Sequence, residues 1–180
     1  RPERGRNLAI AEYPTASGPA DYVLFIGLMP VAVVEAKRKN VDVSAALQQA
    51  KRYSRDFALD ADMQSPGGAW GDPHSGTGYK IPFAFSSNAR PRFPQLETQS
   101  GIWFVDLRRT DNLSHALDGW YTPEGLMTLL KRDEVDANKQ LENEPMEFGF
   151  PLRFYQRDAI RAVEDKIAKG ERNMLIAMAT

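Results

Sequence analysis

The sequence predicts an α/β protein whose mixed central sheet is flanked by helices. Short apolar runs rich in β-branched and aromatic residues predict strands at 22–26, 31–37, 81–86 and 101–106. Segments with apolar residues at helical spacing predict helices at 44–57, 123–131 and 155–168. Strands and helices that intermix in this way are typical of a sheet with helices packed around it.

The first predicted unit is a β-hairpin. Its strands are the apolar runs 22–26 and 31–34, and residues 27–30, with the sequence Gly-Leu-Met-Pro, form the turn between them. Pairing that is symmetric about Leu28 sets Asp21 opposite Glu35. Directly opposed side chains have Cβ atoms roughly 5 Å apart.

The end of this hairpin gathers two carboxylates and one ammonium. Lys37 follows Glu35 by two positions, so these side chains share a face of the strand, across from Asp21. Two carboxylates that close repel unless a cation neutralises them, and hard oxygen ligands suit Mg²⁺. The ammonium can stabilise a reacting phosphate or orient a water. The pattern predicts metal-assisted phosphodiester hydrolysis, although an ordinary solvated strand end also carries such residues.

The helix predicted at 44–57 begins after Asp42 or Ser44, either of which can serve as N-cap. Its predicted buried stripe consists of Ala46, Ala50, Tyr53 and Phe57. Gln49 and Tyr53 are four positions apart and lie on one helix face. Either Tyr53 is a core residue flanked by a polar Gln49, or both side chains point to the strand end that carries Glu35.

These residues resemble a known family. Asp21, the run Glu35-Ala36-Lys37 and the pair Gln49 and Tyr53 resemble the PD-(D/E)xK nuclease core with its added QxxxY motif. The combination is similar to the nuclease domain of the motor subunit of type I restriction enzymes (HsdR) and to RecB-like nucleases. The resemblance covers roughly residues 20–130 and implies a restriction-endonuclease-like core.

The resemblance also implies roles for these residues. Mg²⁺ would be bound by Asp21, Glu35 and the carbonyl of Ala36, and Lys37 would orient or activate the attacking water. Gln49 and Tyr53 would support the site or contact DNA. Such domains usually have an N-terminal helix with an acidic residue that reaches the metal. Only a short stub precedes Asp21 here, and Glu12 within it is not included among the site residues.

The implied partners are double-stranded DNA and the modification (methyltransferase) and specificity subunits of a type I restriction complex. Recognition in this family lies with the specificity subunit, so no sequence preference is expected here. The alternative is a non-catalytic module that docks DNA or partner subunits. We expect a nuclease domain at 1–131, a linker at 132–149 and the start of a motor domain at 150–180.

Between the hairpin helix and that linker the sequence is less informative. Residues 62–80 are rich in Gly, Ser and Pro and predict a long exposed loop, in which His74 is a poor catalytic candidate. Residues 88–100 carry side chains that could face DNA. Pro123 is expected at the first position of the 123–131 helix.

The C-terminal segment predicts a helix at 155–168 and a buried strand at 174–179. The apolar stripe of this helix comprises Tyr155, Ala159, Ala162, Val163 and Ile167, and Gly170 is its expected C-cap. Residues 153–156, with the sequence Arg-Phe-Tyr-Gln, resemble the adenine-reading motif of superfamily 2 helicases, which implies that Gln156 binds nucleotide. Residues 178–180 resemble the residues just before the Walker A lysine of such a motor.

No complete phosphate loop is present, because GxxxxGK[ST] does not occur. We therefore expect ATP to be a cofactor of the full-length motor subunit only, and no ATP hydrolysis by this chain. The alternative is a C-terminal helix and strand that simply dock on the domain.

Charge and composition narrow the function classes. The formal net charge is −1, yet residues 37–55 contain six basic residues and one acid. Of these, Lys39, Lys51, Arg52 and Arg55 are predicted to contact DNA phosphates, unless they form a solvated helix face. A looser basic set comprises Arg90, Arg92, Arg108 and Arg109.

The chain has 180 residues, no cysteine and no apolar run near the roughly 20 residues that span a bilayer. The absence of cysteine excludes a disulfide framework and a thiol metal site. With no signal peptide visible, a cytoplasmic protein without membrane contact is expected. Because the sequence opens with arginine and ends inside an apparent strand, we expect it to be part of a larger polypeptide.

Overall fold

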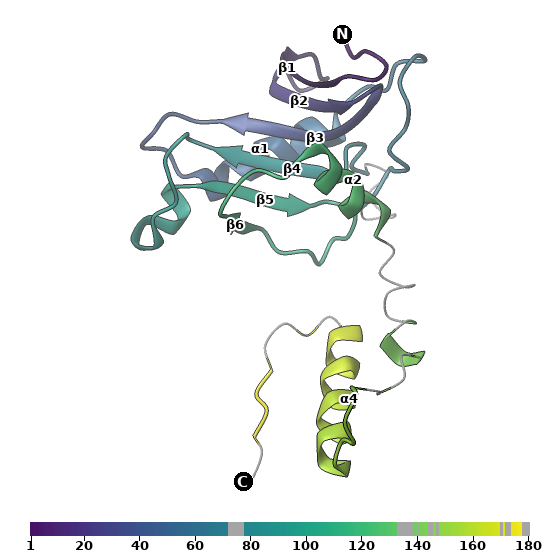
Figure 1. The fold of residues 1–180 in the computed structure, drawn as a ribbon. Coiled ribbons are helices and arrows are strands. Elements are labelled where there is room, and N and C mark those ends of the chain that lie inside the picture. Colours follow the sequence, from purple (N-terminus) through teal and green to yellow (C-terminus); the bar gives the residue numbers. More distant parts are fainter. Residues whose placement is uncertain are drawn as a thin grey trace. The chain divides into compact units, whose positions relative to one another are not determined.

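The computed structural model describes residues 1–71, 78–132, 139, 141–143, 146, 148–169, 171 and 174–177. The chain divides into two compact units, Arg1–Leu130 and Lys131–Thr180. Figure 1 shows the first as a sheet with helices and the second as a helix with an extended segment. His74, Gly170 and residues 178–180, which carried sequence-based expectations, lie outside the described residues, as does much of the expected linker.

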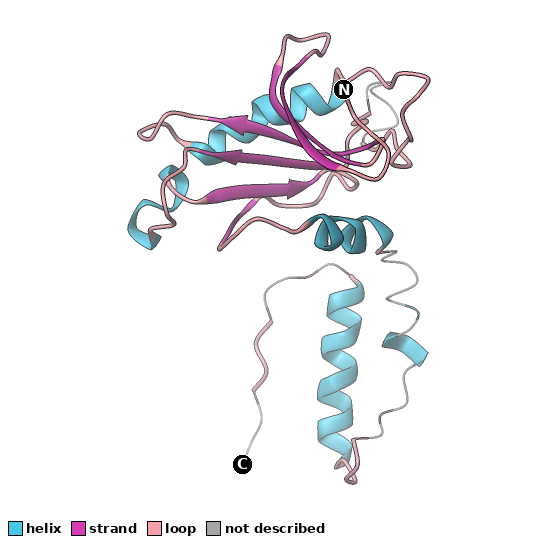
Figure 2. Ribbon diagram, turned by 45° about the horizontal axis from the view of Figure 1, so that its top comes forward, coloured by secondary structure: helices cyan, strands magenta, loops and turns pink. Residues whose placement is uncertain are grey.

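The first unit contains a six-stranded sheet whose strands follow sequence order. The strands are β1 (Asn7–Tyr13), β2 (Ala20–Ile26), β3 (Met29–Ala36), β4 (Phe83–Ser87), β5 (Ile102–Asp106) and β6 (His115–Leu117). β3 and β4 are parallel and the other neighbours are antiparallel. Figure 2 shows β3 and β4 pointing one way and β5 the other. The predicted α/β class and mixed sheet are confirmed.

Two strands were not predicted. β1 lies in the segment expected to be a stub, although Leu8 and Ile10 alternate with smaller or polar residues there. β6 has three residues, too few to give a periodic signal. Both lie at the edges of the sheet, where pairing with a neighbour rather than local propensity defines a strand.

The predicted hairpin is present, but its turn is shorter than expected. Ile26 pairs with Met29, so the loop is Gly27 and Leu28, and Gly27 takes a φ of 60° that suits glycine in a tight hairpin. The second strand therefore begins at Met29, two residues before its predicted start.

A β-bulge then corrects the register. Phe25 pairs with Pro30, but Leu24 pairs with Ala32, so Val31 is an extra residue in β3. Beyond the bulge Tyr22 pairs with Val34, and the next position places Asp21 across from Glu35. Without the extra residue Asp21 would face Val34. The predicted opposition of the two acids therefore holds because of the bulge.

The helix α1 (Val43–Arg55) covers one face of the sheet. The Asp42 side chain caps it by accepting the Ala45 N–H at 2.9 Å, and the cap residue at its C-terminal end is Asp56. The predicted stripe of Ala46, Ala50, Tyr53 and Phe57 is buried, as expected. Phe57 lies just past the helix, which ends two residues before its predicted end.

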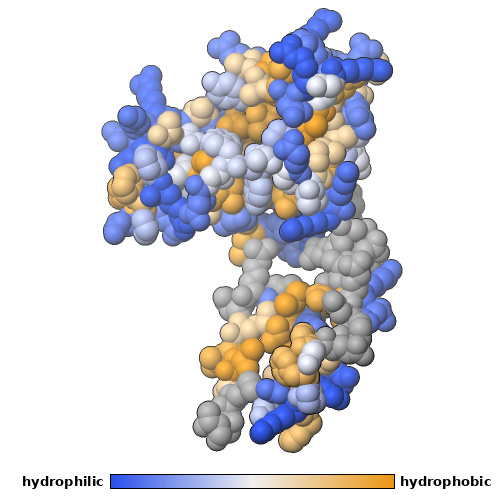
Figure 3. Space-filling model, in the orientation of Figure 1, coloured by the Kyte–Doolittle hydropathy of each residue, from blue (hydrophilic) through white to orange (hydrophobic). Residues whose placement is uncertain are grey.

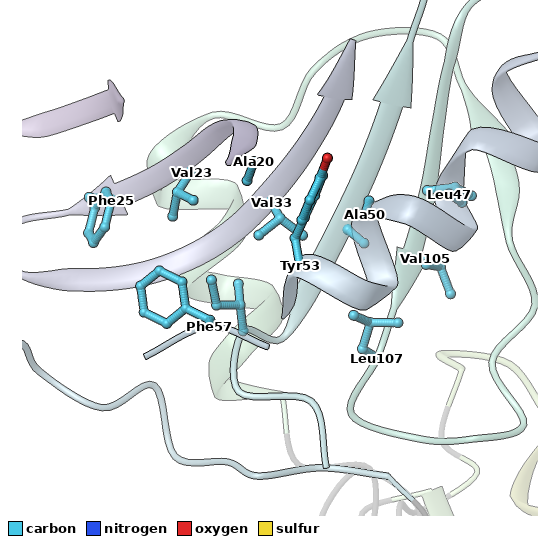
Figure 4. Close-up of a cluster of buried hydrophobic side chains, with 12 residues drawn as sticks. Ala20, Val23, Phe25, Val33, Leu47, Ala50, Tyr53, Phe57, Val105 and Leu107 are labelled. Carbon is cyan, nitrogen blue, oxygen red and sulfur yellow. The ribbon is translucent and has the colours of Figure 1, made fainter. Parts of the chain in front are cut away.

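The two faces of the sheet carry separate core clusters. Val23, Val33 and Phe57 belong to the cluster under α1, part of which is drawn in Figure 4. The opposite face packs Phe83, Phe85 and Phe104 against Leu126 of α2 (Pro123–Lys131), a helix with the predicted bounds. A short 3₁₀ helix, η1 (Pro94–Gln99), precedes β5. The sheet is thus held between α1 on one face and α2 on the other.

The second unit contains α4 (Phe154–Ala168), close to its predicted bounds. Tyr155, Ala159 and Val163 line one groove with residues 174–177, as the predicted stripe requires. The strand expected at 174–179 is wrong over its described part, because 174–177 are irregular. A strand needs a neighbour for its backbone hydrogen bonds, and the described part of this unit contains no other strand.

No helix in the described residues is long and apolar enough to cross a membrane.

Candidate functional site

Asp21, the first acidic residue of the site, uses its side chain to make a hydrogen bond where backbone pairing between β2 and β3 would otherwise continue. The ladder ends at Tyr22 and Val34, and continued pairing would join Ala36 to Ala20. Instead, the Asp21 carboxylate accepts the Ala36 N–H at 2.7 Å through Oδ2. Asp21 is therefore fastened to the end of β3 by a charge-assisted hydrogen bond, which is stronger than a neutral one.

The backbone hydrogen bond of the next residue, Lys37, shows the direction of the Ala36 carbonyl. The Lys37 N–H donates to the Ser87 carbonyl at 2.8 Å, so the backbone of Lys37 faces β4. Successive residues of a strand direct their N–H and C=O groups to opposite sides. The groups of Ala36 therefore face the side where Asp21 lies. This brings a carbonyl oxygen to the same side as the Asp21 carboxylate.

The second acid, Glu35, is buried, with 2% of its surface exposed. Its Oε1 lies 2.5 Å from the Lys37 ammonium, whereas Oε2 has no hydrogen-bond partner among the described residues. Burial raises the pKa of the Glu35 carboxyl, and the Asp21 charge adds to that rise while the hydrogen bond from Lys37 opposes it. The protein thus holds a carboxylate that lacks one stabilising contact.

Lys37 connects Glu35 to the helix. Its ammonium donates to Gln49 Oε1 at 3.3 Å, and Gln49 Nε2 donates to the Tyr53 hydroxyl at 2.5 Å. The residues Glu35, Lys37, Gln49 and Tyr53 therefore form one hydrogen-bonded chain. The structure brings together all four, with Asp21 beside them, as the sequence predicted.

Tyr53 belongs both to the core and to this chain. Its side chain is 6% exposed and packs in the cluster under α1. Figure 4 shows the ring beside Val33 with its hydroxyl turned away from Phe57. The two interpretations of Tyr53 left open by the sequence are therefore compatible, since ring and hydroxyl have different surroundings.

Three of the predicted DNA-contacting residues, Lys51, Arg52 and Arg55, lie on α1 within an arc of about 100°. Arg52 lies about 60° around α1 from Gln49, and its charge opposes the rise that burial causes in the pKa of Glu35. Lys51 lies about 160° from Gln49 on the same helix. Arg55 is paired with Asp56 at 2.9 Å, and that contact lowers the pKa of the Asp56 carboxyl. Lys39 is exposed beyond the end of β3.

Gln156, the predicted nucleotide contact, lies in the second unit. Its Oε1 accepts the Arg153 N–H at 2.9 Å, which caps the first turn of α4. The structure therefore shows a helix-capping contact for this side chain, and nucleotide binding stays a prediction.

Glu12 on β1 lies across from Asp21, between the pairs Ala11–Tyr22 and Tyr13–Ala20. Its φ of 49° interrupts the alternation of side chains, so that Ile10 and Tyr13, three residues apart, pack on the same cluster. Among the described residues no group of three or more His, Cys, Asp or Glu is placed to hold a metal ion. Glu12 therefore does not complete a three-acid site.

A buried amide near the site, Asn88, was not predicted from the sequence; it is 1% exposed and follows β4. A polar residue directly after a buried aromatic strand is the signal that could have identified it.

Comparison with known proteins gives the class of this protein. Residues 1–130 match the family described as the second domain of the type I restriction enzyme EcoKI endonuclease subunit. The chain belongs to the family of type I restriction enzyme endonuclease subunits. It is similar over its whole length to the type I restriction enzyme EcoKI endonuclease subunit of Escherichia coli (strain K12), with 42% identity over 202 residues. The chain spans 17% of the length of that relative, and no solved structure matches it.

The hydrogen-bonded chain leads to a prediction for Gln49 and Tyr53. Tyr53→Phe keeps the ring in the core but removes the acceptor of Gln49 Nε2, which frees the amide to turn away from Lys37. We expect DNA cleavage to fall by about tenfold, the effect of roughly 1.4 kcal/mol, with little change in melting temperature. Gln49→Ala should likewise reduce DNA cleavage with little change in melting temperature.

Cleavage rates and thermal melts of both variants test this expectation. Gln48→Ala, an exposed neighbour on the same helix, is the matched control and should cut DNA as the wild type does. Wild-type cleavage by both Tyr53→Phe and Gln49→Ala would show that the pair only supports the helix.

Proposed function

We propose that the first unit is a magnesium-dependent endonuclease domain with a PD-(D/E)xK core, which cleaves DNA within a type I restriction enzyme subunit. The observation that carries the proposal is the convergence of Asp21, Glu35, Lys37, Gln49 and Tyr53 at one end of the sheet. Membership in an endonuclease subunit family supports the same function.

The donor set suits a hard cation. Glu35 Oε2 is a buried carboxylate oxygen without a hydrogen-bond partner among the described residues, and a cation beside it would satisfy that oxygen and offset the cost of burial. Asp21 and the Ala36 carbonyl are the other protein ligands we assign. Two carboxylates fit Mg²⁺, which commonly keeps several waters and takes further oxygens from a substrate phosphate.

When bound, Mg²⁺ would supply positive charge to a phosphate oxygen and lower the pKa of a coordinated water. The remaining chemistry belongs to the side chains. The Lys37 ammonium, held between Glu35 and Gln49, would orient the attacking water and stabilise charge that develops on the phosphate. Gln49 and Tyr53 would keep that ammonium in place.

We also propose that the partners are those of the whole restriction complex: double-stranded DNA and the modification and specificity subunits. ATP would serve the motor of the full-length subunit, with Gln156 as a candidate adenine contact. The competing function is a docking module that binds DNA or subunits without cutting.

Measurement of Mg²⁺ binding distinguishes the nuclease from the docking module. Titration calorimetry on the wild-type chain should show Mg²⁺ binding that is lost in Asp21→Ala, because that change removes a ligand and the hydrogen bond to Ala36. Asp62→Ala, which removes an exposed carboxylate elsewhere, is the control and should bind Mg²⁺ normally. Plasmid cleavage by Asp21→Ala at the wild-type rate would contradict the site assignment.

A further inference from the structure

A turn at residues 87–90, directly after β4, is held in a strained conformation. Ala89 has a φ of 58°, in the left-handed region that residues with a Cβ rarely adopt. Ser87 Oγ accepts the Ala89 N–H and Asn88 Oδ1 accepts the Arg90 N–H, each at 3.2 Å. Backbone strain that side chains maintain in this way is often found at functional sites.

Asn88 also joins this turn to the segment that follows Lys37. Its buried amide nitrogen lies 3.1 Å from the carbonyl oxygens of Lys39 and Val41 and 2.9 Å from that of Gln99, so its two N–H groups are shared among three acceptors. One side chain thus organises three stretches of backbone at the end of the sheet. A buried amide satisfied this fully indicates that the relative placement of those stretches matters to the fold.

Arg90 is the cation that the turn presents. Its Nη1 lies 3.4 Å from the Lys39 carbonyl, and its guanidinium lies 5.9 Å from the centre of the exposed Phe93 ring. Within the described part of the chain no carboxylate lies in ion-pair distance of Arg90. Arg92, two positions later, differs because it pairs with Asp118 at 2.6 Å and with Glu97 at 3.7 Å.

The topology places this turn beside the candidate site. β3 and β4 are parallel, so Lys37–Lys39 and Asn88–Arg90 leave the sheet at the same end. Asp21, the second residue of β2, lies at that end as well, because β2 runs opposite to β3. The margin of the sheet there is largely hydrophilic in Figure 3. Two cations without acidic partners in the described residues, Lys39 and Arg90, therefore lie at the same end of the sheet as the two carboxylates.

We propose that Arg90 and Lys39 form a phosphate-binding element that holds the backbone of double-stranded DNA next to the cleavage site. The inference rests on the proposed nuclease function and adds the residues that would position its substrate. A guanidinium presents a planar fork of donors that matches phosphate oxygens, and the Phe93 ring and Lys39 carbonyl restrict its movement. Contacts of this kind are independent of DNA sequence.

The salt dependence of DNA binding tests the proposal. The affinity of the full chain for a short duplex is measured by fluorescence anisotropy without Mg²⁺, over a range of salt concentrations. Arg90→Gln should reduce the slope of log affinity against log salt by about 1 and weaken binding of unrelated duplexes to the same extent. Arg90→Lys should retain the slope, because it keeps the charge.

Arg92→Gln is the matched control in the same segment, and we expect a wild-type slope because Arg92 is already paired with two acids. The proposal would be overturned if Arg90→Gln left the slope unchanged, or if Arg92→Gln reduced the slope as much as Arg90→Gln. It would also be overturned if the wild type did not bind DNA. Glu35→Gln, assayed separately with Mg²⁺, should not cut DNA. If instead Glu35→Gln cuts DNA, the nuclease site fails while the Arg90 result stands.

Discussion

Replacement of Glu35 by glutamine should abolish DNA cleavage and, without Mg²⁺, stabilise the fold near neutral pH. Cleavage should fall at least about 100-fold, since the change removes the charge of a proposed metal ligand. Stability should rise because the wild type buries a carboxylate whose Oε2 has no partner in the described residues. A penalty on the order of 1 kcal/mol is typical of such a group.

The stabilisation should depend on pH in a defined direction. Burial raises the pKa of Glu35 above its unfolded value, so the folded state favours the protonated carboxyl. The stability that this preference contributes is fully present below the unfolded pKa, and is lost as pH rises through the folded pKa. Glu35→Gln lacks this titration. The difference in melting temperature should therefore be small in acid, grow as pH rises and then level off.

Thermal melts of both proteins across pH, with and without Mg²⁺, measure this expectation. Mg²⁺ should raise the melting temperature of the wild type alone, because it binds the folded state of that protein. Asp62→Asn serves as the control for loss of an exposed carboxylate. A variant that is less stable than the wild type at every pH would show that Glu35 is a structural ion-pair partner of Lys37 rather than a costly buried acid.

Lys37→Gln should reduce cleavage at saturating DNA by about 100-fold or more, the range that a positioned catalytic group contributes. The change removes the ammonium that links Glu35 to Gln49. It also removes the hydrogen bond that holds the pKa of Glu35 down, so this carboxyl should ionise only at higher pH. The pH at which Mg²⁺ binding reaches half its maximum should therefore move upward.

Single-turnover cleavage and Mg²⁺ titrations over pH distinguish these effects. Arg38→Gln, which removes an adjacent exposed cation, should leave the rate at saturating DNA close to that of the wild type. If Lys37→Gln lost rate while Mg²⁺ binding kept its pH dependence, the two roles given to Lys37 would have to be separated. A wild-type rate in Lys37→Gln would remove it from the proposed chemistry.

Much of the site could be predicted because its residues lie close together in the sequence. Glu35 and Lys37 share a strand face by the two-residue period, and Gln49 and Tyr53 share a helix face by the four-residue spacing. Local periodicity is set by backbone geometry, so these pairings hold in any fold that contains the two elements. The meeting of the pairs required only that α1 pack on β3.

The prediction that Asp21 faces Glu35 depended on tertiary structure to a greater degree. A two-residue turn alone would have shifted the pairing by one position, and the bulge at Val31 compensates for it. Such a bulge has no strong signature in the sequence, because the buried Val31 resembles its strand neighbours. The predicted opposition is correct because the longer turn that was predicted has the same effect on the register as the shorter turn and the bulge together.

The sequence by itself determined the α/β class, four strands, three helices and the identity of the residues that meet at the site, since propensity and periodicity are local properties. Tertiary structure decided the remainder through long-range contacts. It paired the edge strands β1 and β6, left residues 174–177 irregular, turned Ala36 toward Asp21 and placed Arg90 beside Lys39. It also buried Glu35 with one oxygen that has no hydrogen-bond partner in the described part of the chain, which depends on every element packed around that strand end.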